Sequence, residues 1–247
     1  GTPAPAPTLT QDMLVEIWSD IVCPWCYIGK RRFESALARF EHADDVEVRW
    51  RSFELDPNAP FLRSGNMALH LAAKYGMTVE QATDRLQSLN RMAAEEGLDY
   101  DLAHTKGGNT FAAHRLIHLG YATDPATGAA LKEALLEAYF IRLLPVSEPD
   151  VLVETAVKCG LDAGEVTEVL ESDRFAGDVR RDEAEAAALG CTGVPFFVLD
   201  RAFAVPGAQD PETFLATMRR AWDRSHPAME TVIPTDGGVC TDDSCGI

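Results

Sequence analysis

Two cysteines separated by two residues lie where an apolar-alternating segment gives way to a helical pattern. Residues 13–18 alternate as in a β-strand, and residues 27–40 carry apolar side chains at helical spacing. Cys23 and Cys26 therefore occupy a strand-to-helix junction. A helix start leaves backbone N–H groups unpaired and carries partial positive charge, so it favours the thiolate, the reactive form of cysteine. We expect Cys23 to be exposed and ionised, and Cys26, one turn further, to be more buried and protonated.

A dithiol at such a junction can exchange disulfides with a substrate. When the pair is oxidised, a substrate thiolate attacks the sulfur of Cys23, and Cys26 can resolve the mixed disulfide that forms. Pro24 lies in the first helical turn, where a backbone N–H has no partner within the helix. Its missing N–H therefore costs no hydrogen bond, and its ring preorganises the turn. Half of a zinc site and a chance pair of core residues are the alternative interpretations. The position between a strand and a helix favours redox chemistry.

The rest of the chain predicts a small α/β unit interrupted by helices. Residues 46–53 alternate with period two and predict a second strand, parallel to the first, which completes a βαβ unit. From about 64 to 189 the pattern is almost wholly helical, including a helix expected from Ala129 to Leu144. A β-hairpin and a helix that begins at Asp210 follow. The helical block therefore looks inserted into a smaller α/β domain.

Val194 and Pro195 precede the first strand of that hairpin. An X–Pro bond has only a small trans preference, so a fold can hold it in the cis form. One interpretation is a proline that merely begins a strand, where its missing N–H is tolerated. The other is a cis-proline loop that faces the dithiol and exposes Val194 backbone groups to an extended substrate peptide.

Five segments of the chain resemble sequence motifs of a known protein family: residues 19–29 (SDIVCPWCYIG), 53–57 (FELDP), 109–116 (NTFAAHRL), 193–197 (GVPFF) and 207–209 (GAQ). Together they resemble the FrnE-like branch of the DsbA-family thioredoxin-fold oxidoreductases, over roughly residues 13–224. The resemblance implies thiol–disulfide exchange with Cys23 as the nucleophile, Cys26 as the resolving thiol and Pro195 as the cis-proline.

The resemblance also implies the fold class, which is α/β: a thioredoxin-like fold with a large inserted all-helical domain. In this chain we expect an extended C-terminal tail to follow it. We expect four parts: the N-terminal βαβ part at 13–62, the inserted helical domain at 63–174, the C-terminal αββα part at 175–225 and the tail at 226–247.

Substrate-binding contacts are expected at five positions around the dithiol: Pro24, Trp25, Val194, Asn109 and His114. Asn109 has a helix cap as its alternative role, and His114 has packing. His118, one helical turn after His114, could join it on a metal, but no third ligand is evident. Glu54 and Asp20 are both candidates to accept the proton of Cys26.

A second cysteine pair, Cys240 and Cys245, lies in the tail and goes beyond the common family pattern. It could be a second redox centre that exchanges with the first dithiol, or a labile structural or regulatory disulfide. Metal capture with Asp242 and Asp243 is the third hypothesis. A zinc site built from both pairs would silence the first dithiol. The remaining cysteines, Cys159 and Cys191, are expected to pack in the core; the alternative for Cys191, four residues before Pro195, is a position near the active site.

The charge balance bears on partners and location. The 39 acidic residues outnumber the 22 basic ones, and the net charge of −17 disfavours binding to nucleic acid or to an anionic membrane surface. No apolar run approaches the ~18 residues of a transmembrane helix. The N-terminus lacks a signal-peptide pattern, and six cysteines are too few for a disulfide scaffold, so we expect a cytoplasmic protein.

The sequence therefore predicts a protein thiol–disulfide oxidoreductase or isomerase, as monomer or homodimer, that needs no cofactor or metal. Its expected partners are protein thiols and disulfides, with glutathione or unfolded clients as further candidates. Three other hypotheses stay open: a binding protein for unfolded clients, a metal-binding redox stress protein, and a glutathione-dependent isomerase related to kappa-class glutathione transferases. Those transferases usually have serine at the nucleophile position, so the two cysteines favour redox exchange.

Overall fold

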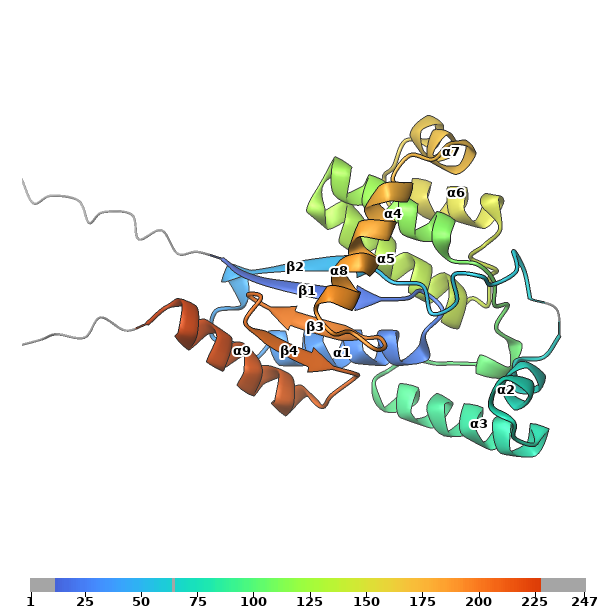
Figure 1. Ribbon diagram of the computed structural model, residues 1–247, viewed down its shortest axis with the longest axis horizontal. Coiled ribbons are helices and arrows are strands. Elements are labelled where there is room, and N and C mark those ends of the chain that lie inside the picture. The colour runs from blue at the N-terminus through green and yellow to red at the C-terminus, as the bar shows by residue number, and fades with distance from the viewer. Residues whose placement is uncertain (1–11, 64, 228–247) are drawn as a thin grey trace, which may run out of the picture.

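The computed structural model describes residues 12–63 and 65–227. Its core is a mixed sheet with strand order β2–β1–β3–β4 (Figure 1). As expected, β1 (Met13–Ser19) pairs in parallel with β2 (Val46–Ser52). The hairpin adds β3 (Phe196–Leu199) antiparallel to β1, and then β4 (Phe203–Pro206) antiparallel to β3.

Helices cover both faces of this sheet, which explains why all of β3 is buried. On one face, α1 (Pro24–Leu37) and α9 (Pro211–Ser225) enclose Phe197 between two aromatic rings. The centroid of Phe197 lies 5.5 Å from Phe33 and 4.5 Å from Phe214. Burying one such ring contributes roughly 1.5–3 kcal/mol, so this cluster anchors α1 and the dithiol at its start.

The other face of the sheet is covered by α8 (Ala176–Ala188). Trp18 of β1 packs there against Ala186 and Phe196 and is fully buried. Its indole N–H donates to the Asp182 carbonyl over 2.7 Å, so the ring is buried without an unpaired donor.

The helical block that the sequence predicts between β2 and α8 contains six helices among its described residues: α2 (Met67–Tyr75), α3 (Val79–Glu95), α4 (Phe111–Thr123), α5 (Pro125–Phe140), α6 (Pro149–Lys158) and α7 (Ala163–Glu171). Two single-turn 3₁₀ segments, Ala43–Asp45 and Leu102–His104, complete the description. In Figure 1, α2 and α3 lie apart from the group formed by α4 to α7. Among the described helices, none has the length and apolar character needed to cross a bilayer.

Local sequence signals set the helix ends. Thr78 and Gln81 form the expected capping box at the start of α3. The helix predicted from Ala129 to Leu144 is shifted, because Asp124 caps α5 and the helix begins at Pro125, four residues before Ala129. The same helix ends at Phe140, and Leu143 takes a left-handed backbone conformation with φ 54°, so the chain has already turned before Leu144.

The inserted helices share a hydrophobic core with the start of α1. Ile21, Tyr27 and Ile28 pack in the same cluster as buried residues of α4 and α5. The thioredoxin-like unit and the helical block therefore meet at the dithiol, with the helical insertion forming one wall of its surroundings.

Candidate active site

The dithiol occupies the strand-to-helix junction that the sequence predicts. Cys23 is the N-cap of α1 with an extended backbone (φ −89°, ψ 114°), and Pro24 is the first helical residue. The Cys26 N–H donates to the Cys23 carbonyl over 3.0 Å, which closes the first turn. The motif Cys-Pro-Trp-Cys is thus a single helical turn.

The loop before β3 lies against this turn. The Val194–Pro195 peptide bond is cis, as expected for a loop of this kind. The Cys23 thiol donates to the Val194 carbonyl, with 3.6 Å between sulfur and oxygen. Segments 171 residues apart in the sequence are therefore in direct contact at the reactive sulfur.

The expectation that Cys23 is exposed is wrong, because the Val194 loop lies over its sulfur. Cys23 is 4% exposed and Cys26 is fully buried. The hydrogen bond with the Cys26 side chain and burial raise the pKa of Cys23 well above its usual value, and the charge of Asp20 adds to this. In this arrangement Cys23 holds its proton at neutral pH, so the predicted ionisation does not occur before substrate or a proton acceptor changes its surroundings.

A buried carboxylate lies just before the dithiol. Asp20 is 1% exposed and accepts hydrogen bonds from the N–H groups of Ile21 (2.7 Å) and Leu55 (2.8 Å) and from His114 Nε2 (3.3 Å). Burial alone would raise the pKa of Asp20, but His114, the Leu55 N–H and the charge of Lys132 outweigh it and lower that pKa. Asp20 is therefore a charged group beneath the active-site turn at neutral pH.

Lys132 of α5 is the cation of this cluster, and the sequence analysis did not single it out. It is 1% exposed, and its ammonium donates to the Ser19 carbonyl over 3.1 Å. Burial lowers the pKa of Lys132 to about 8, against the opposing charges of Cys26, Asp20 and Cys23. One signal was available: Lys132 shares a helix face with Leu135 and Leu136, where an apolar residue is expected.

His114 and Asn109 do not reach the substrate side. The prediction that His114 contacts substrate is corrected, because its side chain is 1% exposed and its Nε2 is engaged by Asp20. Asn109 acts as a cap instead: its Oδ1 accepts from the Phe111 N–H over 2.9 Å at the start of α4. Both residues support the site through the backbone and the buried acid.

The two candidate proton acceptors for Cys26 have different surroundings in the structure. Asp20 lies in the dithiol cluster, whereas Glu54 pairs with Arg180 of α8 over 2.6 Å. Burial raises the pKa of Glu54, and its ion pair with Arg180 offsets part of that rise. The geometry favours Asp20 over Glu54 for any role in moving the proton.

Tyr100 is a second supporting residue that the sequence analysis missed. Its hydroxyl donates to the Pro24 carbonyl over 3.0 Å, and its ring stacks on Phe140 at 4.6 Å and 21°. The inserted segment thus holds the active-site turn directly. No short-range sequence pattern marks this contact, because the two residues are 76 positions apart.

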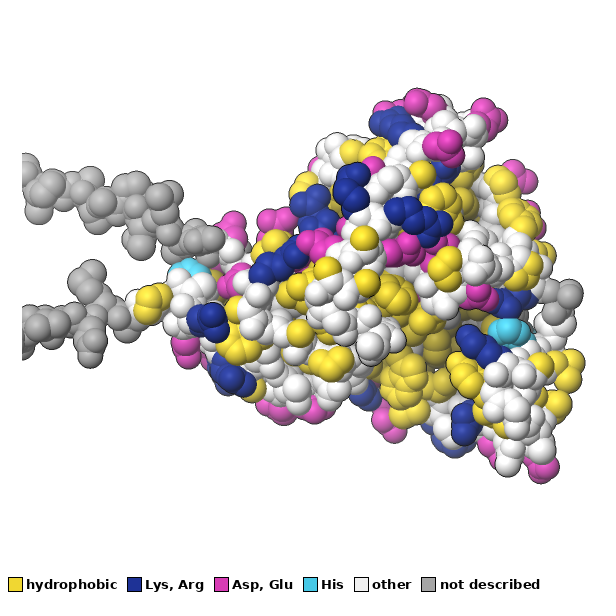
Figure 2. Space-filling view, viewed as in Figure 1, with side chains coloured by type: hydrophobic (Ala, Val, Ile, Leu, Met, Phe, Trp, Pro, Cys, Tyr) yellow, Lys and Arg dark blue, Asp and Glu magenta, His cyan; other side chains and the backbone are white. Residues whose placement is uncertain are grey.

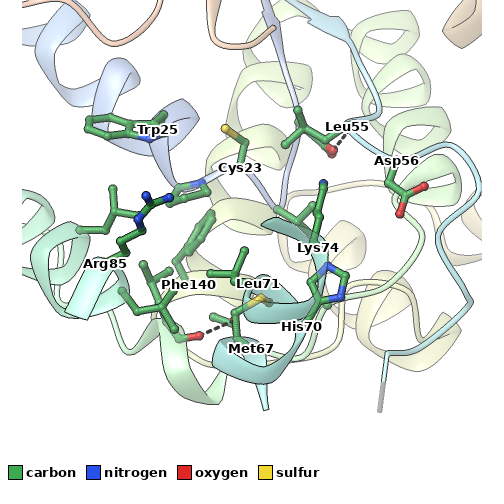
Figure 3. Close-up of a pocket in the computed structure, with 18 of the residues that line it drawn as sticks. Cys23, Trp25, Leu55, Asp56, Met67, His70, Leu71, Lys74, Arg85 and Phe140 are labelled. Carbon is green, nitrogen blue, oxygen red and sulfur yellow. Dashed lines mark hydrogen bonds between the residues drawn. The ribbon is translucent and has the colours of Figure 1, made fainter. Parts of the chain in front are cut away.

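A cavity of about 750 Å³ opens beside Cys23. Pro24, Trp25 and Val194, three of the five expected substrate contacts, line it at the dithiol end. Figure 3 shows Cys23 and Trp25 on one side and Met67 and Leu71 of α2 on the other. Figure 2 shows apolar side chains gathered in a hollow beside the α2–α3 pair. The volume falls in the range of ligand-binding pockets.

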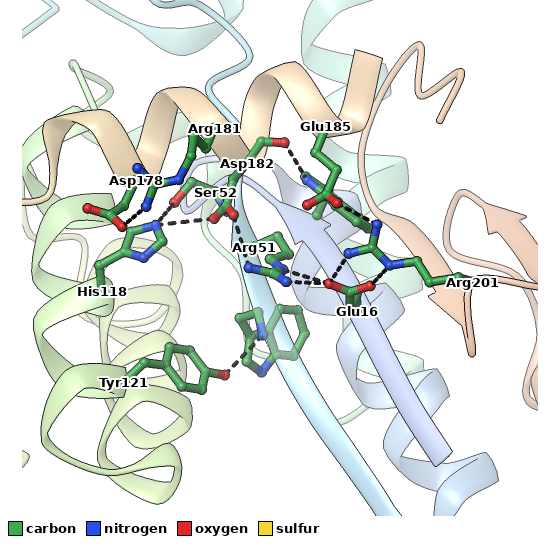
Figure 4. Close-up of polar contacts among 12 residues, drawn as sticks. Glu16, Arg51, Ser52, His118, Tyr121, Asp178, Arg181, Asp182, Glu185 and Arg201 are labelled. Atoms are coloured by element: carbon green, nitrogen blue, oxygen red, sulfur yellow. Dashed lines mark hydrogen bonds and ion pairs between the residues drawn. The ribbon is translucent and has the colours of Figure 1, made fainter. Parts of the chain in front are cut away.

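A polar cluster of Ser52, His118 and Asp182 joins α4 and α8 to the end of β2 (Figure 4), and none of the three lines the cavity beside Cys23. Ser52 and Asp182 both contact Nε2 of His118, each at 3.1 Å. A serine–histidine–acid catalytic triad needs the serine and the acid on different ring nitrogens, and Ser52 is 2% exposed. This cluster therefore ties α4 and α8 to the sheet and is not a second catalytic centre.

The other cysteines are dispersed. Cys191 is partly buried and its thiol donates to the Gly193 carbonyl over 3.3 Å, while Cys159 ends α6 in a partly buried position. Cys240 and Cys245 lie outside the described residues. Within residues 12–63 and 65–227, no three histidine, cysteine or acidic side chains are grouped to hold a metal ion.

Comparisons with known proteins agree with this geometry. A family model described as the DSBA-like thioredoxin domain matches residues 14–219. The structure is similar to that of a probable DsbA oxidoreductase from Streptomyces coelicolor, at 46% sequence identity and a TM-score of 0.81, covering 95% of this chain and 99% of that one.

Two further relatives are more distant. The uncharacterized protein YwbO of Bacillus subtilis is 27% identical over 204 residues, which is 81% of this chain and 92% of that protein. A 2-hydroxychromene-2-carboxylate isomerase shares the fold at 17% identity and a TM-score of 0.63, covering 86% of this chain and 97% of that one. The family match extends over most of the chain and includes both the dithiol and the cis-proline loop. The chain therefore belongs to the DSBA-like thioredoxin domain family and is a thiol–disulfide oxidoreductase.

Proposed function

We propose that this chain exchanges disulfides with protein substrates, as a reductase or isomerase, through Cys23 as the attacking thiol and Cys26 as the resolving thiol. The observation that carries the proposal is the unequal access of the two sulfurs. Cys23 lines the 750 Å³ cavity, whereas Cys26 is fully buried one turn behind it. A substrate sulfur that enters the cavity meets Cys23 first.

The chemistry follows from this order. In the reduced protein, the Cys23 thiolate attacks one sulfur of a substrate disulfide, and the other substrate sulfur leaves as a thiolate that takes up a proton. Cys26 then loses its proton and attacks the Cys23 sulfur, which closes the Cys23–Cys26 disulfide and releases the second substrate thiol. Two electrons pass from the dithiol to the substrate. Isomerisation ends instead when a substrate thiol displaces Cys23 from the mixed disulfide.

Residues around the dithiol align the substrate, accept the proton of Cys26 and compensate negative charge. Val194 borders both Cys23 and the cavity, which suits it to align an extended substrate segment. Asp20 is the charged group nearest in the chain to the motif and takes the role of proton acceptor for Cys26. Lys132 offsets the negative charge that accumulates when thiolates form beside Asp20.

Client binding is a second activity that one observation favours. Large apolar side chains are exposed at the mouth of the cavity: Trp25 is 38% exposed, Leu55 44% and Tyr75 59%. Exposed apolar surface of this kind marks interaction sites in soluble proteins. A variant with serine at Cys23 should then still suppress the aggregation of an unfolded client.

Reduction of insulin by the full chain, with dithiothreitol as the terminal reductant, tests the main proposal. Cys23→Ser should abolish turnover, and Cys26→Ser should accumulate a mixed disulfide with the substrate at Cys23. Cys191→Ser is the matched control, since Cys191 lies in the same loop region but outside the cavity lining, and it should retain full activity. Full activity of Cys23→Ser would rule out the assignment, and a strict requirement for glutathione would favour the isomerase alternative.

The tail pair, Cys240 and Cys245, belongs to this proposal only as a relay that accepts electrons from or donates them to the first dithiol. Under mild oxidation, Cys26→Ser should then trap a Cys23–tail disulfide, detectable by mass spectrometry of the digested protein. Absence of that cross-link, with normal insulin reduction by a Cys240→Ser/Cys245→Ser variant, would remove the tail from the electron path.

A further inference from the structure

The wall of the cavity opposite the dithiol is adaptable and apolar. Helices α2 and α3 and the turn between them place three methionines against the cavity: Met67, Met77 and Met92. The whole chain has six methionines, so half of them are gathered here. Unbranched thioether side chains fill irregular spaces and suit surfaces that accept apolar side chains of different shapes.

Two cations reach into the same cavity. Lys74 extends from α2 and Arg85 from α3, and in Figure 3 both point toward the end of the cavity at which Cys23 and Trp25 lie. Within the part of the chain that the structure describes, neither side chain has a carboxylate partner within 4 Å. Both are exposed.

Two neighbouring basic side chains, Arg63 and His70, do not add an uncompensated positive charge to the cavity. Arg63 forms an ion pair with Asp56, so its charge is already compensated. Burial and the charge of Arg63 lower the pKa of His70, which is therefore neutral at pH 7. Asp84 and the buried Asp20 also line the cavity, so the charges of the whole lining balance. On the α2–α3 wall, however, the two uncompensated cations outnumber the one carboxylate of Asp84, which leaves this wall locally positive in a chain whose net charge is −17. Such a local field attracts a negatively charged group.

We propose that this cavity selects polypeptide substrates in which the reacting cysteine lies close to a large apolar residue and to an acidic residue. The apolar side chain would enter the methionine-lined space, and the carboxylate would pair with Lys74 or Arg85. The inference rests on the proposed function, because the selected substrate is the one that Cys23 attacks.

A polypeptide fits the observations better than a small anionic thiol. The exposed apolar side chains of Leu55 and Tyr75 extend the binding surface to the mouth of the cavity, where a small ligand buried beside Cys23 would leave them uncovered. An extended chain that passes the Val194 loop would cover them. A small anionic disulfide therefore becomes one outcome of the test.

The test uses the reduced full-length protein and a set of short peptides that each hold one intramolecular disulfide. All peptides carry phenylalanine beside one cysteine, and they differ only in the following residue, which is glutamate, glutamine or lysine. The second-order rate constant for disulfide reduction should follow the order glutamate, glutamine, lysine. Glutamate gains one exposed ion pair and lysine meets a like charge, so together they predict a preference of about 3- to 20-fold for glutamate over lysine, which should shrink in 0.5 M salt.

Charge reversal supplies the decisive comparison. In Lys74→Glu/Arg85→Glu the preference should invert, with the lysine peptide reacting faster. The matched control is Arg220→Glu/Arg224→Glu on α9, which changes the net charge equally. These two arginines lie over the Phe203 ring, outside the cavity lining. The control should keep the original preference, and thermal melting verifies that both variants fold; Lys74→Gln/Arg85→Gln should reduce the preference without inverting it.

Three outcomes would overturn the inference. The first is equal rates for the three peptides with the unmodified protein. The second is a preference that survives Lys74→Glu/Arg85→Glu. The third is reduction of glutathione disulfide faster than the glutamate peptide with the same sensitivity to charge reversal, which would assign the cavity to a small anionic disulfide. Failure of the proposed function looks different: the protein would then reduce neither insulin nor any peptide of the set.

Discussion

Gly29 of α1 lies directly against the ring of Pro195. A β-carbon at residue 29 would come within 2.9 Å of Pro195 Cγ and within 3.3 Å of the Ala208 side chain. Real β-carbons essentially never approach another heavy atom so closely, so any side chain here must displace the loop. The absence of a side chain at Gly29 allows the loop that carries Val194 to approach the dithiol.

Gly29→Ala is therefore expected to push the Pro195 loop away from Cys23. Overpacking of this kind typically costs about 1–3 kcal/mol of unfolding free energy, and the contact between the Cys23 thiol and the Val194 carbonyl should lengthen. We expect a loss of insulin reduction together with lower stability in urea.

Gly177→Ala is the control for this substitution. In α8 the added β-carbon would have the Arg181 side chain, at 3.7 Å, as its nearest neighbour, which is ordinary contact. Alanine also has the higher helix propensity, so this variant should match or exceed the stability of the parent. Equal behaviour of the two variants would show that the Gly29 contact does not position the loop.

The second prediction concerns the buried pair Asp20–His114. His114→Leu removes the Nε2 donor and leaves one Asp20 oxygen with fewer partners in a site that water does not reach, at a cost of about 1–3 kcal/mol. His114→Gln keeps an N–H donor and should cost less. Urea unfolding at pH 7 measures both.

The same pair predicts how stability depends on pH. Burial lowers the pKa of His114 below its usual value, against the opposing charge of Asp20. The unfolded chain therefore takes up this proton first as the pH falls, and stability declines below about pH 6.5. His114→Gln should lose less stability than the parent between pH 6.5 and pH 5. An identical decline in both proteins would place the titrating group elsewhere.

Local sequence patterns were sufficient to predict the main strands and helices of the fold. The period-two alternation of β1 and β2, the capping box at Thr78 and the apolar spacing of α1 are properties of short segments, and the structure confirms each of them. The cis peptide at Pro195 was also expected, because the residues around it resemble a known family.

The surroundings of the dithiol could not be predicted in the same way. Cys23 was expected to be exposed, but the group that covers it, Val194, is 171 positions away. Lys132 and Tyr100 reach the active-site turn from segments that a reading of local periodicity assigns only to helices or to a loop. Contacts at such separations depend on how the inserted helices pack, and no spacing rule within one segment encodes them.

The third prediction tests the ion pairs of a buried carboxylate on the other face of the sheet. Glu16 is 1% exposed and binds the guanidinium groups of Arg51 in β2 and Arg201 in the β3–β4 turn (Figure 4). Glu16→Gln leaves both cations without this charge partner. Arg201 is 41% exposed and can turn toward water, so we expect a loss of about 2–3 kcal/mol, below the usual range for a fully buried pair.

Glu212→Gln provides the matched comparison for Glu16. Its partner Arg39 and Glu212 itself are both exposed, at 44% and 74% of their side-chain surfaces, so breaking this pair should change stability by less than about 1 kcal/mol. The urea concentrations at the unfolding midpoints of the two variants, each compared with that of the parent, measure the two stability losses. Similar losses in both would mean that the burial of Glu16 adds nothing to the strength of its ion pairs.

The last prediction concerns Lys132, the cation buried behind the dithiol. Burial lowers the pKa of Lys132 to about 8, while the charges of Cys26, Asp20 and Cys23 favour the ammonium form. Cys23 holds its proton at neutral pH, so a cysteine charge arises only in the small fraction of molecules in which a thiolate forms, and the Lys132 ammonium stabilises that thiolate. Lys132→Met should therefore lower the rate at which iodoacetamide alkylates the reduced dithiol, by about 3- to 10-fold at pH 7, because only the thiolate reacts.

The pH dependence separates this effect from a packing change. The folded-state pKa of Lys132 lies below the value of about 10.4 for an unperturbed lysine, so the ammonium opposes folding by on the order of 3 kcal/mol below pH 8, and this cost fades as the pH rises from about 8 to 10.4. The stability gain of Lys132→Met should fade over the same interval, and its effect on the alkylation rate should vanish above about pH 9. Lys158→Met, which changes an exposed lysine paired with Glu154 on α6, is the control and should leave the alkylation rate unchanged. Mass spectrometry of the labelled protein over time gives both rates. An unchanged or faster alkylation in Lys132→Met would show that Lys132 does not stabilise the thiolate.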